Sequence, residues 1–338
     1  MADEQTCCGC ADLTSEDDYN TPLHIGAIFI LFAVSAAGTL LPVVSKHVPA
    51  LSSNSMIMEW LMTFGFGVVI ATGFIHMMNE GIEMLSNPCL GQVVENYESL
   101  GLAVVLATVV VMHLIECESA VFFADKTQHL HGHAHGHAHG HVHDAPLSAA
   151  NAVVITPNDE ENPYHQEKLS ANTSIETKNK KMLAAILFEV GVVFHSVIVG
   201  IDLGVTAGTE FKTLLAAMCF HQFFEGIAIS GSAIGAMESL RNVLSMNFAF
   251  AITTPVGMAI GIAIRTTYSS TSTTALWVQG ILNCVAGGIL LYTGLVELLT
   301  YHMTTNNEFL GRSGKQRFLL YLACWLGAGA MALIGKWA

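Results

Sequence analysis

Residues 182–205 read MLAAILFEVGVVFHSVIVGIDLGV, an apolar run that is long enough to cross a bilayer as a helix. A helix that crosses the hydrocarbon core needs about 20 predominantly apolar residues. Seven further runs of this kind occur along the chain. They lie near residues 23–44, 57–79, 101–124, 211–234, 246–265, 276–299 and 317–337. The sequence therefore predicts an all-α integral membrane protein with eight transmembrane helices.

The overall composition favours a lipid environment. Of the 338 residues, 52% are hydrophobic and only 12% are charged, and the mean hydropathy is +0.52. An ordinary soluble domain cannot hide that much apolar surface. The formal net charge of -14 gives no indication of nucleic-acid binding, so the bilayer is the expected surrounding and no nucleic-acid partner is expected.

The basic residues predict the orientation of the helices, because cytoplasmic loops carry an excess of Lys and Arg. One set of loops holds Lys46, Lys126, Lys168, Lys178, Lys180, Lys181, Arg241, Arg312, Lys315 and Arg317, and the opposite set holds Lys212, Arg265 and Lys336. Both termini are therefore expected to be extracytoplasmic. The acidic N-terminus lacks the features of a cleavable signal peptide, so the first helix is expected to remain as an anchor.

The predicted spans divide the chain into four parts. An acidic tail with cysteines at 1–22 precedes helices one to three at 23–124, and helices four to eight occupy 182–338. Between these two helical parts, residues 125–181 form a long hydrophilic insert, which the basic residues place in the cytoplasm. Its polar composition cannot bury enough apolar surface to fold, so the insert is expected to be disordered.

A histidine repeat, HLHGHAHGHAHGHVH, lies near the start of this insert. Its histidines are His129, His131, His133, His135, His137, His139, His141 and His143. Neutral imidazole is a common ligand of transition metals. The repeat is therefore expected to bind metal in order to sense it, buffer it or accept emerging ions, rather than to form the pore.

The eight cysteines fall into an outer group of four and a group within the spans. Only the outer group, which is Cys7, Cys8, Cys10 and Cys89, is expected to be able to form disulfides. The CCGC cluster could equally hold a soft metal or belong to an unstructured tail, and four cysteines allow several pairings.

The fourth span carries ionisable side chains that would lie within the hydrocarbon core. Placing such groups there costs free energy, so they are candidates for a functional role. His195 and Asp202 stand seven residues apart and so share one face of the helix, and Ser196 follows the histidine. Asp202 lies nearer to the outer end of the span, so a role as a packing partner is an alternative for it.

The fifth span carries His221 and Glu225 at i, i+4, with Gln222 beside the histidine. This spacing points an imidazole and a carboxylate in the same direction, as a metal site on a helix requires. Two imidazoles and carboxylates on adjacent helices suit Zn, Fe, Mn or Co better than Ca or Mg. The alternative is that the histidines are buried packing residues with satisfied hydrogen bonds.

Two other spans carry weaker candidates for a metal pathway. In the second span, His76 and Glu80 lie on a stripe that runs to the outer face, where a hydrated ion could be handed inward. In the third span, His113 and Glu116 could line the exit. The alternatives are a solvated helix end for the first pair and a polar seam between helices for the second.

Three stretches resemble the ZIP (Zrt-, Irt-like protein) family, in particular its plant, fungal and protist branch. They are HSVIVGIDLG at 195–204, HQFFEGIAIS at 221–230 and GGILLYTGLVELL at 287–299. The resemblance covers nearly the whole chain, including the order of three helices, a His-rich loop and five helices. It implies uptake of a divalent metal into the cytoplasm and a homodimer. Because the sequence shows no obvious organelle address, the plasma membrane is the expected location, with an internal compartment as the topologically equivalent alternative.

By the same resemblance, the transport site lies between the fourth and fifth helices, on His195, Ser196, His221, Gln222 and Glu225. Some members of the family have a two-metal centre, with Asn after the histidine of the fourth helix and Glu four residues after it. This chain has Ser196 and Val199 at those positions. The resemblance therefore does not extend to a second, bridged metal.

Two other functions fit the sequence less well. Cation diffusion facilitators export metal, but they have six spans and a soluble C-terminal domain. An intramembrane metallohydrolase would need a pattern such as HExxH, which this sequence lacks. We therefore expect a transporter of zinc, or of iron(II), and not an enzyme, with the metal as substrate and no cofactor. His and carboxylate ligands accept both metals, so the sequence does not choose between them.

Overall fold

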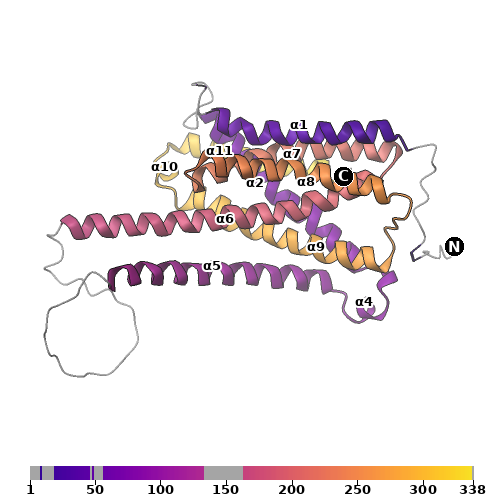
Figure 1. The fold of residues 1–338 in the computed structure, drawn as a ribbon, viewed down its shortest axis with the longest axis horizontal. Helices are drawn as coiled ribbons and strands as arrows, with labels where there is room; N and C mark the ends of the chain where they lie inside the picture. The colour runs from indigo at the N-terminus through magenta and orange to yellow at the C-terminus, as the bar shows by residue number, and fades with distance from the viewer. Residues whose placement is uncertain (1–7, 10–18, 46–47, 49–55, 133–162, 337–338) are drawn as a thin grey trace. The chain divides into compact units, whose positions relative to one another are not determined.

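The computed structural model describes residues 8–9, 19–45, 48, 56–132 and 163–336, and it describes the backbone alone at 95, 123–132, 163–177 and 180. Within these ranges all regular elements are helices (Figure 1). In chain order they are α1 (Thr21–Ser45), α2 (Met56–Ala71), η2 (Thr72–Met78), α3 (Asn79–Leu85), η3 (Pro88–Leu90), α4 (Gln92–Asn96), α5 (Leu100–Gly132), α6 (Pro163–Val205), α7 (Gly208–Ala236), α8 (Leu240–Ile264), α9 (Thr273–Tyr292), η4 (Thr293–Thr304), α10 (Asn307–Leu310) and α11 (Gly314–Ile334).

Eight helical stretches within the described ranges are long and apolar enough to span a membrane, which confirms the predicted fold class. They are Thr21–Ser45, Met56–Leu85, Leu100–Phe122, Lys181–Val205, Gly208–Ala236, Leu240–Ile264, Thr273–Thr304 and Gly314–Ile334. The second and seventh spans extend beyond their predicted ends. In the second span the π-helical segment η2 joins α2 to α3, and in the seventh span the π-helical segment η4 continues α9.

At the two ends of the hydrophilic insert, the described backbone continues the helices of the neighbouring spans, while residues 133–162 lie outside the described ranges. The helix α5 continues to Gly132, and α6 begins at Pro163. Proline is well suited to the first turn of a helix, where its missing N–H costs nothing. The Gln, Glu, Lys and Leu residues that follow Pro163 are good helix formers, and a polar helix can continue beyond the apolar span.

The described chain divides into two compact units. One comprises residues 1–113 and 182–338, and the other comprises residues 114–181. The second unit consists of the continuation of α5 from Leu114 and the part of α6 up to Lys181. The first unit contains the other spans and the part of α6 that carries His195, so the packing and site geometry below concern this unit unless stated otherwise.

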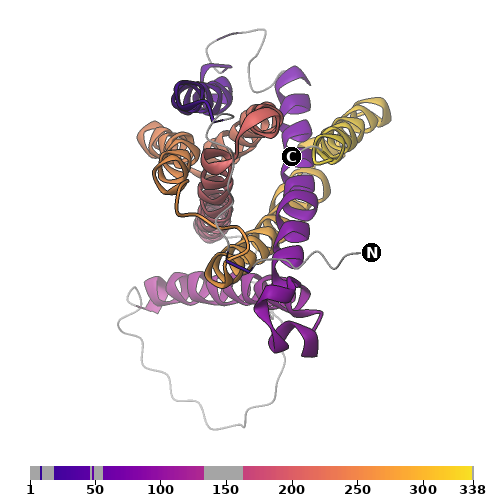
Figure 2. The ribbon, with the colours of Figure 1, turned by 90° about the vertical axis from the view of Figure 1, so that its right-hand side faces the viewer.

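The helices of the first unit pack in overlapping pairs. α1 packs against α7 and α8, α2 packs against α11 and α7, and α9 packs against η2 and α3 (Figure 2). Through these pairs, α7 contacts α1 on one side and α2 on another. The helix with His221 and Glu225 is therefore held between the first and second spans.

Two glycines allow α2 and α11 to approach closely. A Cβ atom on Gly327 would lie 2.1 Å from the carbonyl oxygen of Phe64, and one on Gly67 would lie 2.0 Å from the carbonyl oxygen of Cys324. In each case the obstacle is backbone, which cannot move aside as a flexible side chain can. Such close contacts between backbones are a common way to pack helices in membranes, where the hydrophobic effect does not drive helix association.

The Gly327→Ala variant is therefore expected to be less stable than the wild type. Overpacking of a tight contact typically costs about 1–3 kcal/mol, which should lower the melting temperature of the detergent-purified protein by several degrees. Thermal unfolding followed by size-exclusion chromatography measures this change.

The matched control is Gly329→Ala on the same helix, where a Cβ atom would meet nothing within 4 Å. Its melting temperature should equal or slightly exceed that of the wild type, because alanine is the better helix former. Equal melting temperatures for the two variants would show that α2 and α11 do not pack as described.

Candidate metal centre

The helices α6 and α7 place two pairs of neighbouring polar residues inside the bundle. His195 and Ser196 on α6, and His221 and Gln222 on α7, all have 0% exposure, and so does Glu225 one turn further along α7. The i, i+4 spacing on α7 puts the imidazole and the carboxylate on the same face of that helix. The structure therefore brings together His195, His221 and Glu225, and it buries Ser196 and Gln222, which are their neighbours in the sequence.

The geometry of three of these residues fits a metal ion. One ligand atom from each of His195, His221 and Glu225 lies within 4.8 Å of the other two. Zinc binds imidazole nitrogen and carboxylate oxygen at about 2.0–2.2 Å, so an ion placed among these atoms would need only small side-chain movements to bind all three. The donor set is borderline in hardness, which suits zinc and iron(II).

The second span contributes a third imidazole. His76 lies on η2, is 8% exposed, and has its ring centroid 5.6 Å from that of His195 and 5.8 Å from that of His221. The rings of His195 and His221 are 5.7 Å apart, so the three rings form a triangle with nearly equal sides. π-helical segments are rare and often occur at functional sites.

Several buried polar atoms of this cluster lack hydrogen-bond partners among the described residues. This holds for both ring nitrogens of His195, the Nε2 atom of His76, the Ser196 hydroxyl and the Gln222 amide, whereas His221 lies near the backbone carbonyl of Ala217 and Glu225 near the Thr72 hydroxyl. Leaving one buried polar group unsatisfied costs about 1–3 kcal/mol. A bound cation would satisfy several of these groups at once, which packing alone does not explain.

The other predicted residues lie outside this cluster. Asp202 accepts hydrogen bonds from Tyr268 and Gln279, and its position two turns from His195 corresponds to about 10 Å along the helix. Glu80 lies on α3, one turn beyond His76. Nδ1 of His113 is 3.0 Å from the Tyr292 hydroxyl, so this histidine has a polar partner within the bundle.

The remaining predicted residues belong to the third span and the insert. Glu116 lies in the unit of residues 114–181, where its carbonyl oxygen accepts a hydrogen bond from the Ser119 hydroxyl. His129 and His131 lie on the helical backbone of α5, but their side chains are outside the described part of the chain. His133 and the histidines that follow it up to His143 lie outside the described residues altogether.

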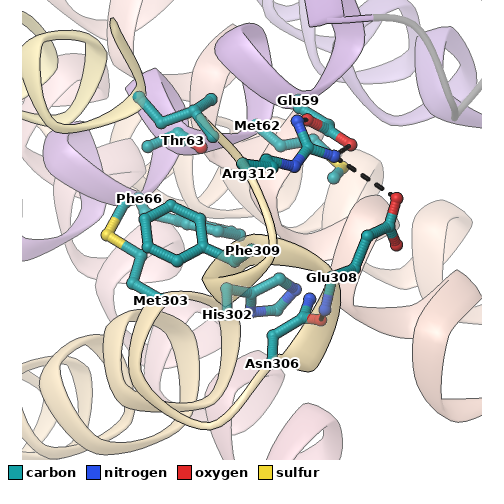
Figure 3. Close-up of a pocket in the computed structure, with 11 residues that line it drawn as sticks. Glu59, Met62, Thr63, Phe66, His302, Met303, Asn306, Glu308, Phe309 and Arg312 are labelled. Atoms are coloured by element: carbon teal, nitrogen blue, oxygen red, sulfur yellow. Dashed lines mark hydrogen bonds and ion pairs between the residues drawn. The ribbon is translucent and has the colours of Figure 1, made fainter. Parts of the chain in front are cut away.

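A cavity that the sequence did not reveal lies between α2, η4, α10 and α11 (Figure 3). Its volume is about 200 Å³, and its lining includes His302, Glu308 and the ion pair of Arg312 with Glu59. The hydrogen bonds that Arg312 donates to Glu59 raise the pKa of the guanidinium, so it remains charged. No local signal links Glu59 to Arg312, because 253 residues separate them in the sequence.

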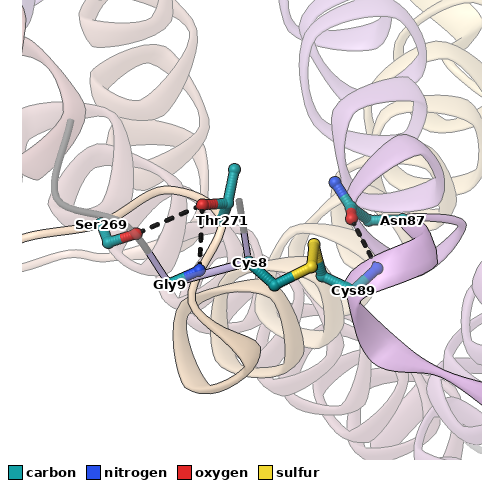
Figure 4. The surroundings of a disulfide bond; sticks show 6 residues. All are labelled: Cys8, Gly9, Asn87, Cys89, Ser269 and Thr271. Atoms are coloured by element: carbon teal, nitrogen blue, oxygen red, sulfur yellow. Dashed lines mark hydrogen bonds between the residues drawn. A yellow bond between two sulfur atoms is a disulfide. The ribbon is translucent and has the colours of Figure 1, made fainter. Parts of the chain in front are cut away.

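The structure also assigns one of the cysteine pairings that the sequence left open. Cys8 and Cys89 form a disulfide with a Cα–Cα distance of 5.5 Å (Figure 4). The next residue, Gly9, donates a backbone hydrogen bond to the Thr271 hydroxyl at 3.3 Å. The Cys8 and Cys89 sulfurs are thus not available to a soft metal, while Cys7 and Cys10 lie outside the described ranges.

Comparison with known proteins finds relatives whose names describe transport of zinc or iron. The family model described as ZIP Zinc transporter matches residues 21–335. "Zinc transporter 7" of Arabidopsis thaliana is 32% identical, over 94% of this chain and 85% of that protein. "Fe(2+) transport protein 1" of the same plant is 32% identical, over 94% of this chain and 86% of that protein. "Zinc-regulated transporter 1" of Saccharomyces cerevisiae is 34% identical, over 95% and 89%. Because the family model covers nearly the whole chain, this protein belongs to the ZIP zinc transporter family.

Proposed function

We propose that this protein carries a divalent transition metal, zinc or iron(II), across the membrane into the cytoplasm. The observation that carries this proposal is the buried cluster of His195, His221 and Glu225, whose ligand atoms converge inside the described part of the bundle. The names of the relatives, which refer to transport of zinc and of Fe(2+), support the same choice of substrates.

The proposed ligands come from three spans. His195 from α6 and His221 with Glu225 from α7 are the proposed primary ligands, and His76 from η2 adds an imidazole as the ion enters or leaves. Ser196 and Gln222 lie next to the two primary histidines and supply oxygen atoms that replace water ligands. A site of this kind must bind with moderate strength, because an ion that is held too tightly is not released.

We infer that the site transports metal rather than catalysing a reaction on a bound substrate. His221 and Glu225 both serve as ligands in this proposal, so the i, i+4 pair leaves no separate carboxylate for the role that the Glu of HExxH plays as general base in zinc proteases. Cation diffusion facilitators export metal from the cytoplasm, so the direction of metal flux distinguishes that function from the uptake proposed here.

Uptake of radiolabelled zinc and iron(II) by metal-starved cells tests the proposal. Cells that express His195→Ala, His221→Ala or Glu225→Ala should lose most of the uptake seen with the wild type, because each change removes one of three ligands. Uptake is compared at matched surface levels of protein, and competition between the metals ranks them.

The control for this experiment is Cys324→Ala, which removes a buried sulfur on α11 without touching the proposed ligands. This variant should transport like the wild type. Undiminished uptake in the three ligand variants would contradict the assigned site, and net efflux by the wild type would favour the exporter.

We also propose that both termini are extracytoplasmic and that the protein resides in the plasma membrane. Besides the basic residues, the Cys8–Cys89 disulfide supports this orientation, since disulfides persist in oxidising compartments. Epitopes at either terminus should be stained in intact cells. An epitope inserted after Ala149, in the hydrophilic insert, should be stained only after permeabilisation, and the reverse pattern would overturn the orientation.

In the cytoplasm, the histidine repeat at 129–143 would buffer the ions that leave the transport site, because neutral imidazole binds these metals. We also expect the protein to form a homodimer, an expectation that rests on the resemblance to the family.

A further inference from the structure

The cavity between α2, η4, α10 and α11 has no part in the proposed transport function. Its volume is about 200 Å³, and none of the residues that line it belongs to the proposed transport site. Its lining includes the apolar side chains of Met62, Phe66, Met303 and Phe309. The π-helical segment η4 carries Met303, and π-helical segments are rare and often occur at functional sites. The cavity is therefore a candidate for a second binding site.

Three charged side chains line this cavity. Arg312 lies between Glu59 and Glu308 (Figure 3), and it donates to Glu59 through both of its terminal nitrogens and to Glu308 at 3.3 Å. Two carboxylates and one guanidinium leave the lining with one surplus negative charge. The Glu308 side chain is 72% exposed, whereas that of Glu59 is 17% exposed. Glu308 is therefore the carboxylate that a ligand can reach.

The imidazole of His302 adds a further polar group to the lining. Its Nδ1 atom is 3.0 Å from the carbonyl oxygen of Leu298, so the neutral ring donates from Nδ1 and has an acceptor at Nε2. This tautomer is assigned from the hydrogen bond. A neutral His302 does not compensate the surplus negative charge. The polar part of the cavity therefore favours a ligand that is positively charged and donates hydrogen bonds.

The lining also indicates which kind of cation would bind. Among the described residues, the His, Cys, Asp and Glu side chains whose ligand atoms converge as a metal requires are His195, His221 and Glu225, so the acids of the cavity do not form a metal site. Phe66 and Phe309 supply aromatic rings, whose faces attract ammonium groups. The volume is smaller than the about 300–1,000 Å³ of pockets for drug-sized ligands. A small organic ammonium group fits these properties.

We propose that this cavity binds a small organic ammonium group, which the ethanolamine headgroup of a phospholipid supplies. The ammonium pairs with the Glu308 carboxylate, and its methylene groups contact Phe66 and Phe309. A lipid headgroup can reach this place, because Glu59 lies near the start of the span Met56–Leu85 and Arg312 lies just before the span Gly314–Ile334. The ends of spans lie at the level of the headgroups.

A basic side chain beside the cavity would accommodate the phosphate of such a lipid. Arg317 lies near the start of α11, and its Nη1 atom donates to the carbonyl oxygen of Leu310 at 3.5 Å. Leu310 follows Phe309, which lines the cavity. Positive charge is thus held next to the negatively charged cavity. A zwitterionic headgroup has the complementary charges, whereas a soluble amine would use the cavity alone.

The melting temperature of the protein purified in a maltoside detergent tests this proposal. It is measured with increasing amounts of phosphatidylethanolamine and with the N-acetylated form of the same lipid, which keeps the phosphate and the acyl chains but lacks the ammonium. A ligand that binds only the folded protein stabilises it increasingly as its concentration exceeds the Kd. We expect a rise of several degrees with phosphatidylethanolamine and little change with the N-acetylated lipid.

The Glu308→Gln variant removes the charge of the exposed carboxylate and keeps its shape. It should raise the concentration of phosphatidylethanolamine that gives half of the effect by about tenfold, a change typical of one lost hydrogen bond to a charged group. The matched control is Glu238→Gln, which removes an exposed acid that does not line the cavity. This control should respond to the lipid as the wild type does.

Equal rises with the two lipids would overturn the proposal, because the phosphate or the acyl chains would then be responsible. An equal response of Glu308→Gln and the wild type would overturn it as well, and so would the absence of any rise. Free ethanolamine is the last ligand to be tested. If it alone gives the full rise, the result supports the ammonium site and identifies a soluble amine, rather than a lipid, as its ligand.

Discussion

The structure depends on keeping imidazole and carboxylate side chains inside a bundle that lies in lipid. His195, His221 and Glu225 have 0% exposure, although burial of such groups is costly. A protein that only needed to pack these helices would use apolar side chains there. The arrangement becomes favourable when a cation binds. Part of the binding free energy then compensates for the cost of burying these polar groups, and this limits the affinity of the site.

The surrounding helices account for how the ligands are held. α7 packs against α1 and α2, and close contacts at Gly67 and Gly327 join α2 to α11. The π-helical segment η2 lies in the middle of the second span and carries His76 towards the other two histidines. A ligand set drawn from α6, α7 and η2 can change its geometry when these helices shift relative to one another, which release of the ion on the opposite side requires.

Much of this fold follows from the sequence, because each span is an apolar run whose length reports the thickness of the bilayer. The same holds for His221 and Glu225, since i, i+4 spacing on one helix fixes their common direction without knowledge of the neighbours. The helical ends of the insert were not predicted, because polar composition indicates disorder even where helix propensity is high. Their place on adjacent predicted helices indicates that His195 and His221 share a site, but the sequence does not reveal that α6 and α7 bring the two rings to a separation of 5.7 Å.

Contacts between segments that are far apart in the sequence could not be predicted from it. Asp202 accepts hydrogen bonds from Tyr268 and Gln279, which are 66 and 77 residues away in the sequence. The disulfide partners Cys8 and Cys89 are 81 residues apart. Neither pairing has a local periodicity that could indicate it. The position of His76 beside the other imidazoles likewise depends on the π-helical turn, which no simple pattern of residues predicts.

We expect one divalent ion to bind to His195, His221 and Glu225 within the membrane. Zinc-edge anomalous diffraction from crystals of the zinc-loaded protein tests this binding most directly, because it locates the ion without regard to the histidine repeat. We predict an intramembrane peak at about 2.0–2.2 Å from an imidazole nitrogen of each histidine and from a carboxylate oxygen of Glu225. A well-occupied intramembrane zinc peak elsewhere, with these three side chains unligated, would contradict it.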